Sequence, residues 1–266
     1  MSESLRVVDG RNVLELRRRL AHPPATVWRA ITEPEQLRHW FPATVEFDAA
    51  VGAKVRYEFD GADGGEGEIT AYEPPRLFEY TWSGSILRWE LAPTDGGTLL
   101  VFTHVFDDRP GAASFAAGWD ACVAALRALL DGAAPPEPSR MVAEHEDFVR
   151  RFGLDEGTVE RAGDGCRVRF ERQLTAPAER AWAVATGGAE VSVGGAAPAG
   201  LGGGTVTEVE PHRLLAFDGA DGRVRWELGE GTGHGARLVV TSTGPRDTSA
   251  AWHDRIEALA AALAAE

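Results

Sequence analysis

The chain has 266 residues, 44% of them hydrophobic, which is enough for two ordinary domains with a core each. The formal net charge is −14 and both halves are acidic, so the surface is unsuited to following nucleic-acid phosphates. Apolar runs of about 18 residues are absent and the N-terminus is polar, so we expect neither membrane insertion nor a signal peptide. The two cysteines, Cys122 and Cys166, lie in unrelated contexts, which favours a reducing cytoplasm over a disulfide framework.

The first half of the chain predicts a strand, two short helices, a run of strands and a long helix. The first strand covers 13–20, Pro23 and Pro24 open a short helix through Ile31, and a second helix covers 35–40. Gly and Asp turns then separate short strands, as in an antiparallel meander, near 45–47, 54–59, 66–72, 76–82, 85–91 and 98–106. Trp119, Val123 and Leu126 recur at helical spacing, which predicts a helix over about 114–130.

The second half predicts a shorter set of the same elements. A Pro-rich segment over 133–139 and a charged helix over 141–152 precede it. The expected elements are a strand over 166–174, a helix over 177–186, strands near 204–209, 213–217, 223–228 and 236–242, and a helix over 248–264. The second short helix and one strand are expected to be missing. Residues 187–204, rich in Gly and Ala, stand in their place.

Three tryptophans of the second half repeat tryptophans of the first, which indicates a tandem duplication. Trp28 and Trp182 have similar surroundings and lie 154 positions apart. Two further pairs follow at shorter offsets: Trp89 and Trp226 at 137, and Trp119 and Trp252 at 133. The shrinking offset means that the second copy has lost 17 residues between its first helix and its middle strands. Whatever that segment does in the first copy, we do not expect the second copy to do.

Several short motifs of the first half occur in a fixed order. They are Pro-Pro-Ala-Thr-Val-Trp at 23–28, Thr-Glu-Pro-Glu-Gln-Leu at 32–37 leading to Trp40 and Phe41, Tyr-Glu-Pro-Pro-Arg-Leu at 72–77, Trp82, Gly-Thr at 97–98, Thr-His at 103–104 and Gly-Trp at 118–119. As a set they resemble the activator of heat-shock protein 90 ATPase homologue-like family of the START-like (SRPBCC) superfamily, over nearly all of residues 10–132. The second copy is similar only through the internal repeat, and it lacks the segment with Trp40 and Phe41.

The resemblance implies an α+β fold with two helix-grip domains, each a curved antiparallel sheet around a long C-terminal helix. We expect a complete START-like domain over 1–134, a linker with a short helix over 135–153, and a truncated, degenerate START-like domain over 154–266. In such folds a cavity lies between the sheet and the helix. We expect a cavity able to hold a drug-sized ligand, about 300 Å³ or more, in the first copy alone.

The side chains that would line this cavity follow from strand alternation and from the repeat. Strand 98–106 is apolar on both faces, so alternation cannot orient it. Its repeat carries Arg237, which favours water, and this orientation points His104 into the cavity. The candidate ligand-binding residues are Trp40, Phe41, Tyr57, Tyr80, Trp82, Trp89, Phe102 and His104. A histidine in an aromatic pocket is also the best candidate for an acid/base group, although a structural role is common for such residues.

Other constellations carry little chemistry. Neither HExxH nor CxxC spacing occurs, so we expect no metal and no cofactor. The glycines over 200–204 precede a strand rather than a helix, so they lack the helix N-terminus of a phosphate loop. The three arginines at 17–19 alternate faces along a strand, and we interpret them as a solvated strand surface.

The resemblance implies no common set of catalytic residues, because its superfamily includes lipid and hormone binders, aromatic cyclases and co-chaperone domains. We expect a cytoplasmic, non-catalytic protein that binds a hydrophobic or aromatic small molecule in the first copy, without nucleic acid. One alternative is a cyclase- or hydratase-like enzyme that uses His104 or a pocket tyrosine. Another is a co-chaperone or protein-interaction module of the stress response, with a chaperone as partner.

Overall fold

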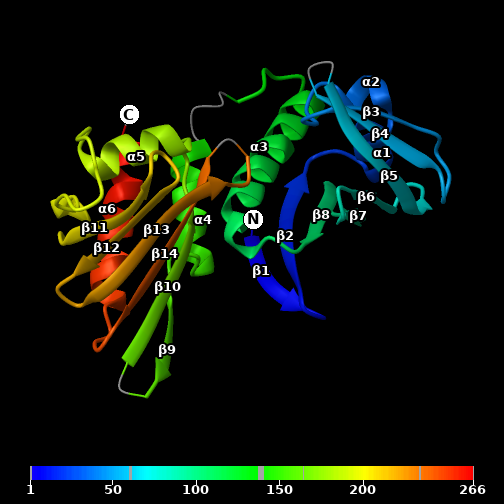
Figure 1. Cartoon of the computed structure of the whole chain (residues 1–266). Coiled ribbons are helices and arrows are strands. Elements are labelled where there is room, and N and C mark those ends of the chain that lie inside the picture. The colour runs from blue at the N-terminus through cyan, green and yellow to red at the C-terminus, as the bar shows by residue number, and fades with distance from the viewer. Residues whose placement is uncertain (1, 60–61, 137–140, 164, 234, 266) are drawn as a thin grey trace. The chain divides into compact units, whose positions relative to one another are not determined.

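A computed structural model describes residues 2–59, 62–136, 141–163, 165–233 and 235–265 (Figure 1). The chain is α+β, with one antiparallel sheet of eight strands and another of six, so the predicted fold class is confirmed. It divides into two compact units. The first unit comprises Met1–Ala112 and Ala116–Met141, and the second comprises Ala113–Phe115 and Val142–Glu266.

The first unit is built around the eight-stranded sheet. Its strands are β1 (Ser2–Val8), β2 (Arg11–Leu20), β3 (Thr44–Phe47), β4 (Lys54–Phe59), β5 (Ala62–Glu73), β6 (Leu77–Trp82), β7 (Ser85–Thr94) and β8 (Gly97–Phe106). Its helices are α1 (Pro24–Thr32), α2 (Pro34–Leu37), the 3-10 turn η1 (Arg109–Gly111) and α3 (Ala112–Asp131). The strand order β1-β2-β8-β7-β6-β5-β4-β3 is a meander that β1 and β2 join at the β8 side.

The second unit repeats this plan with fewer strands. Its strands are β9 (Thr158–Ala162), β10 (Gly165–Gln173), β11 (Thr205–Glu210), β12 (Leu214–Gly219), β13 (Gly222–Glu230) and β14 (Ala236–Gly244), in the order β11-β12-β13-β14-β10-β9. Its helices are α4 (Met141–Phe152), α5 (Ala178–Thr186), the 3-10 turn η3 (Ala199–Leu201) and α6 (Ser249–Ala264).

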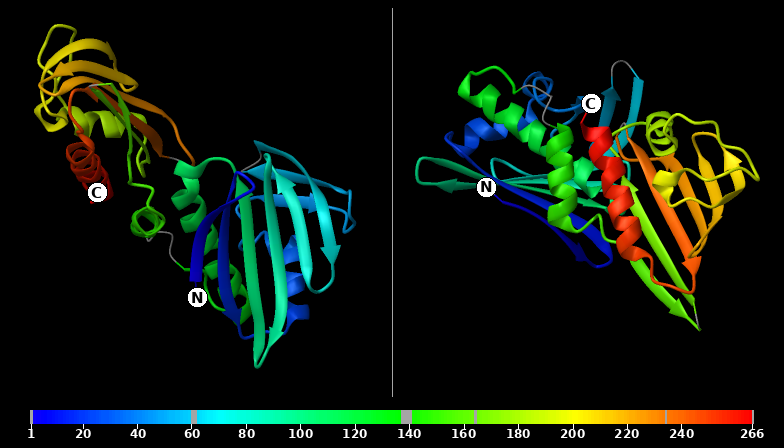
Figure 2. Two further views of the ribbon diagram at one scale, coloured as in Figure 1. Left: turned by 90° about the horizontal axis from the view of Figure 1, so that it is seen from below. Right: turned by 90° about the vertical axis from the view of Figure 1, so that its left-hand side faces the viewer.

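In each unit the last helix, α3 or α6, lies along one face of its own sheet (Figure 2). We call this face of each sheet its inner face. Trp119 of α3 contacts Phe102 of β8 with ring centroids 4.5 Å apart, and Trp252 of α6 belongs to the core cluster of the second unit. The stretch Arg109–Asp131 is also long and apolar enough, by length and composition alone, to cross a membrane, a property that core helices share.

Local sequence explains these elements. Pro24 occupies the first turn of α1, where its missing N–H needs no partner, and the buried side chains of α1 include Val27 and Trp28. Strand β8 alternates buried and half-buried residues along its whole length, as a strand between two neighbours does. Helix α3 ends at Gly132, whose φ of 66° is the left-handed conformation that glycine adopts without strain.

Strand pairing shows the duplication directly. Trp89 of β7 is paired with Phe102 of β8, and Trp226 of β13 is paired with Val240 of β14. Trp226 lies 137 positions after Trp89, and Val240 lies 138 positions after Phe102, so both members of the pair repeat at nearly the same offset. The tryptophans aligned by sequence therefore occupy equivalent places in the two sheets.

The second unit lacks more than the sequence predicts. Its sheet ends at β11, so it has no counterparts of β3 and β4, and the described residues 187–204 contain η3 but no counterpart of α2. The missing helix is confirmed, but the expectation of one missing strand is wrong, because two are absent. The edge strands β1 and β9 were not predicted, because their mostly polar, exposed sequences carry no apolar periodicity.

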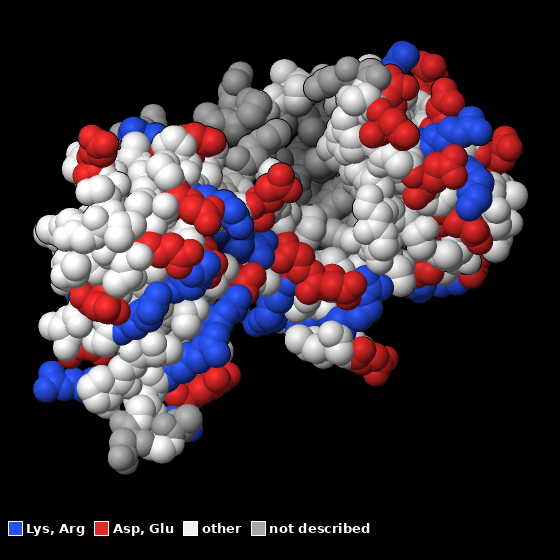
Figure 3. All heavy atoms as spheres, in the orientation of Figure 1, with Lys and Arg blue, Asp and Glu red and all other residues white. Residues whose placement is uncertain are grey.

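The outer faces of both sheets carry paired Arg and Glu side chains, and Figure 3 shows acidic and basic side chains interleaved over the second unit. Arg88 lies between Glu79 and Glu90 at 2.9 and 3.0 Å. Its repeat counterpart Arg225 pairs at 2.9 and 3.0 Å with Glu208 and Glu227, which is the same arrangement in the second sheet. Such exposed ion pairs contribute little to stability. In each sheet the charge of the arginine is compensated by the two neighbouring glutamates.

Candidate functional site

Two cross-strand rows of side chains cover the inner face of the first sheet. The upper row contains, in order across β2, β8, β7 and β6, Leu14, His104, Leu87 and Tyr80. The lower row contains, in the same strand order, Leu16, Phe102, Trp89 and Phe78. All eight side chains are buried. His104 is 4% exposed while Thr103 is half-buried, so the predicted orientation of this strand is confirmed.

Two further aromatic side chains come from the turn after α2 and pack over these rows. The Trp40 ring lies 5.4 Å from that of Trp89. The Phe41 ring lies 5.9 Å from Trp82 of β6 and 5.8 Å from Trp119 of α3, so it touches both the sheet and the helix. Both side chains are buried, and together they close the space between sheet and helix with aromatic rings.

The remaining predicted residues stack beside Phe41. The Tyr57 and Trp82 rings are stacked at 4.7 Å, and Phe59 stacks on Trp82 at 5.5 Å. Tyr57 is buried and Trp82 is half-buried, but Phe59 is 37% exposed. Phe59 therefore lies at the margin of the cluster and not inside it, contrary to what strand alternation predicts. All eight candidate residues belong to one set of contacting side chains.

Most polar atoms of this set have partners inside the protein. The bonds to backbone carbonyls are Trp40 Nε1 to Ala30 O at 2.9 Å, Tyr57 Oη to Thr81 O at 2.9 Å and Trp82 Nε1 to Gly64 O at 3.3 Å. The Trp89 indole N–H donates to the Tyr80 hydroxyl at 3.2 Å. Burial raises the pKa of both tyrosines, so each is a neutral phenol.

His104 accepts a hydrogen bond from Trp119 and is held in its neutral form. The Trp119 indole N–H donates to its Nδ1 at 3.2 Å, so the ring proton of the neutral form is on Nε2. Burial, followed by the charge of Arg11, lowers the pKa of His104 to about 3. The imidazole is therefore neutral near pH 7, and a lone pair that a base would use is already occupied.

The second unit has the same rows with different chemistry. The upper row there contains Val168, Ser242, Val224 and Phe217, so Ser242 replaces His104 and Phe217 replaces Tyr80. Leu201, in the loop that replaces α2, is buried in the core of this unit. The hollow left among Leu201, Phe217, Ser242 and Trp252 is about 50 Å³, room for little more than water. The inner face of the second unit is therefore filled.

Outside the inner faces, each unit has an open groove at an equivalent place. The groove of the first unit, about 400 Å³, is lined by residues that include Pro24, Pro75, Arg76 and Leu91. The groove of the second unit, about 450 Å³, is lined by their counterparts Ala178, His212, Arg213 and Leu228, among others. Both units keep this groove because the flanking helix and turn survive the 17-residue loss, and it is separate from the cavity that the sequence predicts between sheet and helix.

Sequence analysis missed an inner-face arginine that both units share, half-buried in the first and buried in the second. Arg18 and Arg172 are 154 positions apart and lie on the inner faces of β2 and β10. Arg18 pairs with Glu3 at 2.6 Å and with Asp120 of α3, so the interpretation of residues 17–19 as a solvated surface is wrong for this residue. Arg18 lies two residues from both Leu16 and Leu20 along the strand, and this spacing could have indicated that it shares their inner face.

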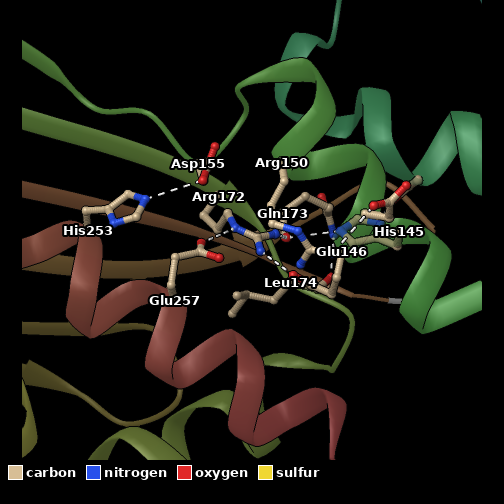
Figure 4. Close-up of polar contacts among 11 residues, drawn as sticks. His145, Glu146, Arg150, Asp155, Arg172, Gln173, Leu174, His253 and Glu257 are labelled. Atoms are coloured by element: carbon tan, nitrogen blue, oxygen red, sulfur yellow. Dashed lines mark hydrogen bonds and ion pairs between the residues drawn. The ribbon is translucent and has the colours of Figure 1, made fainter. Parts of the chain in front are cut away.

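In the second unit this arginine ties three elements together (Figure 4). Arg172 is 1% exposed and pairs with Glu257 of α6 at 2.9 Å and with Glu146 of α4 at 2.5 Å. Its third bond goes to the carbonyl of Gln173 at 2.6 Å. Burial alone would lower the pKa of Arg172, but the two carboxylates outweigh it and raise the pKa. The arrangement holds α4 to the second unit through Glu146 Oε2.

Metal chemistry has no visible site in the part of the chain that the structure describes. Groups of three or more His, Cys, Asp or Glu side chains that could hold a metal ion are absent there. Cys122 and Cys166 are free thiols, and burial raises the pKa of Cys122 to about 12.

Comparisons with known proteins bear on the first unit. Residues 21–131 match the family model described as Activator of Hsp90 ATPase homolog 1-like protein. No curated protein matches the chain. Among solved structures, the conserved protein of unknown function EF2215 from Enterococcus faecalis is 20% identical, with a TM-score of 0.49 over 56% of this chain and 91% of that one.

Two other solved structures are similar over about half of the chain. CalU16 from Micromonospora echinospora is 22% identical, with a TM-score of 0.46 over 56% of this chain and 94% of that one. Protein MLL2253 from Mesorhizobium loti is 27% identical, with a TM-score of 0.43 over 46% of this chain and 98% of that one. The ordered motifs and the family match agree over residues 21–131, so this segment is similar to domains of the Activator of Hsp90 ATPase homolog 1-like family.

Proposed function

We propose that the first unit binds an apolar or aromatic small molecule between its sheet and α3, without catalysing a reaction on it. The observation that supports this most is the difference between the two repeats. The second unit keeps the fold although Phe217 and Ser242 stand where the first has Tyr80 and His104. The fold therefore does not require these polar side chains. Their retention in the first unit indicates a role other than folding.

The segment with Trp40 and Phe41 supports the same proposal. It is absent from the second unit, where Leu201 fills the inner face instead. Phe41 belongs to neither the sheet nor the long helix, yet its ring contacts Trp82 on one and Trp119 on the other. We propose that this turn covers the ligand site and that Phe41 gives way when a ligand enters.

The enzyme alternative is less well supported. A general acid or base works best when its pKa lies near the operating pH. His104 has a pKa of about 3, and its Nδ1 already accepts a hydrogen bond from the Trp119 indole N–H. Burial holds Tyr80 as a neutral phenol, which leaves it as a hydrogen-bond partner rather than a base.

A calorimetric titration of the full chain with 2-acetylnaphthalene tests the proposal. We expect saturable binding at one site per chain. The matched variants are Trp89→Phe and Trp226→Phe, because these tryptophans occupy equivalent places in the two sheets. Trp89→Phe should weaken binding several-fold and Trp226→Phe should leave it unchanged. Absence of binding by a panel of neutral aromatic compounds would contradict the proposal and leave a protein-interaction role as the alternative.

A further inference from the structure

The interior of the first unit contains a hydrogen-bond donor that the protein does not use. The indole N–H groups of Trp40, Trp82 and Trp119 and the hydroxyl of Tyr57 all donate to acceptors of the chain itself. The Tyr80 hydroxyl differs, because its bond with Trp89 is one in which it accepts. A phenol hydroxyl can accept a hydrogen bond and also donate one, so the Tyr80 hydroxyl can still donate its own proton to an acceptor.

Within the described part of the chain, the Tyr80 hydroxyl proton has no acceptor. Tyr80 is 4% exposed, so bulk water does not reach it freely. Tyr80 belongs to the upper row of side chains on the inner face, the side of the sheet that α3 covers (Figure 2). Buried donors are rarely left without a partner, and those that are often meet a water or a ligand.

Cations around this space are already neutralised. The guanidinium of Arg18 on the inner face is shared by Glu3 and Asp120, and Arg11, whose charge reaches His104, pairs with Asp107 at 2.7 Å. His104 is uncharged near pH 7, and Cys122 is a neutral thiol. A carboxylate that entered here would lose its hydration without gaining an unpaired cation, which disfavours its binding.

Resting on the proposed function, we propose that the first unit takes uncharged molecules that carry one hydrogen-bond acceptor, such as a ketone or ether oxygen, which the Tyr80 hydroxyl binds. Carboxylates such as fatty acids are excluded. Tyr80 is then a specificity-determining residue. At the position of Tyr80 the second unit has the buried Phe217, whose side chain carries no donor.

The test uses three compounds of nearly the same shape on the full chain. They are 2-acetylnaphthalene with a ketone oxygen, 2-isopropylnaphthalene with no acceptor, and 2-naphthoate with a carboxylate. The variant is Tyr80→Phe, which the fold should accept because Phe217 stands at that place in the second unit. The matched control is Tyr72→Phe, a half-buried tyrosine whose ring contacts Trp28 and Phe78.

We expect the ketone to bind the parent chain roughly 2- to 12-fold more tightly than the hydrocarbon, the range of one neutral hydrogen bond. This ratio should fall to about one in Tyr80→Phe and stay unchanged in Tyr72→Phe, while 2-naphthoate binds none of them. Equal binding of ketone and hydrocarbon by the parent chain, or tight binding of the carboxylate, would overturn the inference and leave the proposed function standing. Failure of all three compounds to bind would instead remove the proposed function on which it rests.

Discussion

At the scale of single residues, His104 gives the clearest expectation about pH. Its pKa is about 3 in the folded chain, against about 6.5 for an unfolded histidine. Between these values the unfolded chain binds a proton that the folded chain does not, so the free energy of unfolding falls as the pH decreases from about 6.5 toward 3. His145, buried in the second unit with a pKa of about 4, acts in the same direction.

Denaturant unfolding at pH 7 and pH 5 measures this effect. Each of the two histidines is expected to lower the free energy of unfolding by up to about 2 kcal/mol between pH 7 and pH 5. His104→Gln keeps an acceptor for Trp119 but does not titrate, so its loss between the two pH values should be smaller than that of the parent chain by about this amount. A loss in His104→Gln as large as in the parent chain would show that the histidine is not held neutral.

At the scale of elements, the turn after α2 carries the account of ligand access. If the Phe41 ring occupies the place of the ligand, the ligand must displace it on binding. Phe41→Ala should then bind 2-acetylnaphthalene about tenfold more tightly, which corresponds to ~1.4 kcal/mol of binding free energy. The same change should lower the free energy of unfolding by about 3–5 kcal/mol, because it opens a cavity. Phe47→Ala is the control, since Phe47 contacts Phe78 away from this turn, and it should leave the affinity unchanged. Weaker binding by Phe41→Ala would place Phe41 in the wall of the site.

Strand faces show how far the sequence alone can lead at this scale. Alternation and the repeat oriented β8 correctly, because Arg237 lies on the outer face of β14 and the equivalent face of β8 is opposite to the one that carries His104. They failed for Arg18, whose partner Asp120 lies 102 positions away on another element. Alternation indicates on which face of a strand a residue lies. An arginine on an inner face needs an ion-pair partner there, and a partner distant in sequence is identified only once the fold is known.

At the scale of the whole molecule, the duplication was predictable from three tryptophan pairs, and so was the loss of α2 from the second copy. The way the second unit compensates was not. Residues 187–204 carry no periodicity, yet Leu201 and Ala197 from this loop are buried in the core. Their burial depends on tertiary packing of an irregular loop, which apolar patterning does not encode.

The central claim is that one of two repeated folds keeps a ligand site and the other is filled. A crystal structure of the full chain grown with 2-acetylnaphthalene tests it most directly. The account predicts the naphthalene between β6 and α3 of the first unit, with Phe41 displaced and the ketone oxygen within hydrogen-bond distance of the Tyr80 hydroxyl, and no ligand inside the second unit. A ligand inside the second unit, or one held only in the open grooves with the aromatic cluster undisturbed, would contradict it.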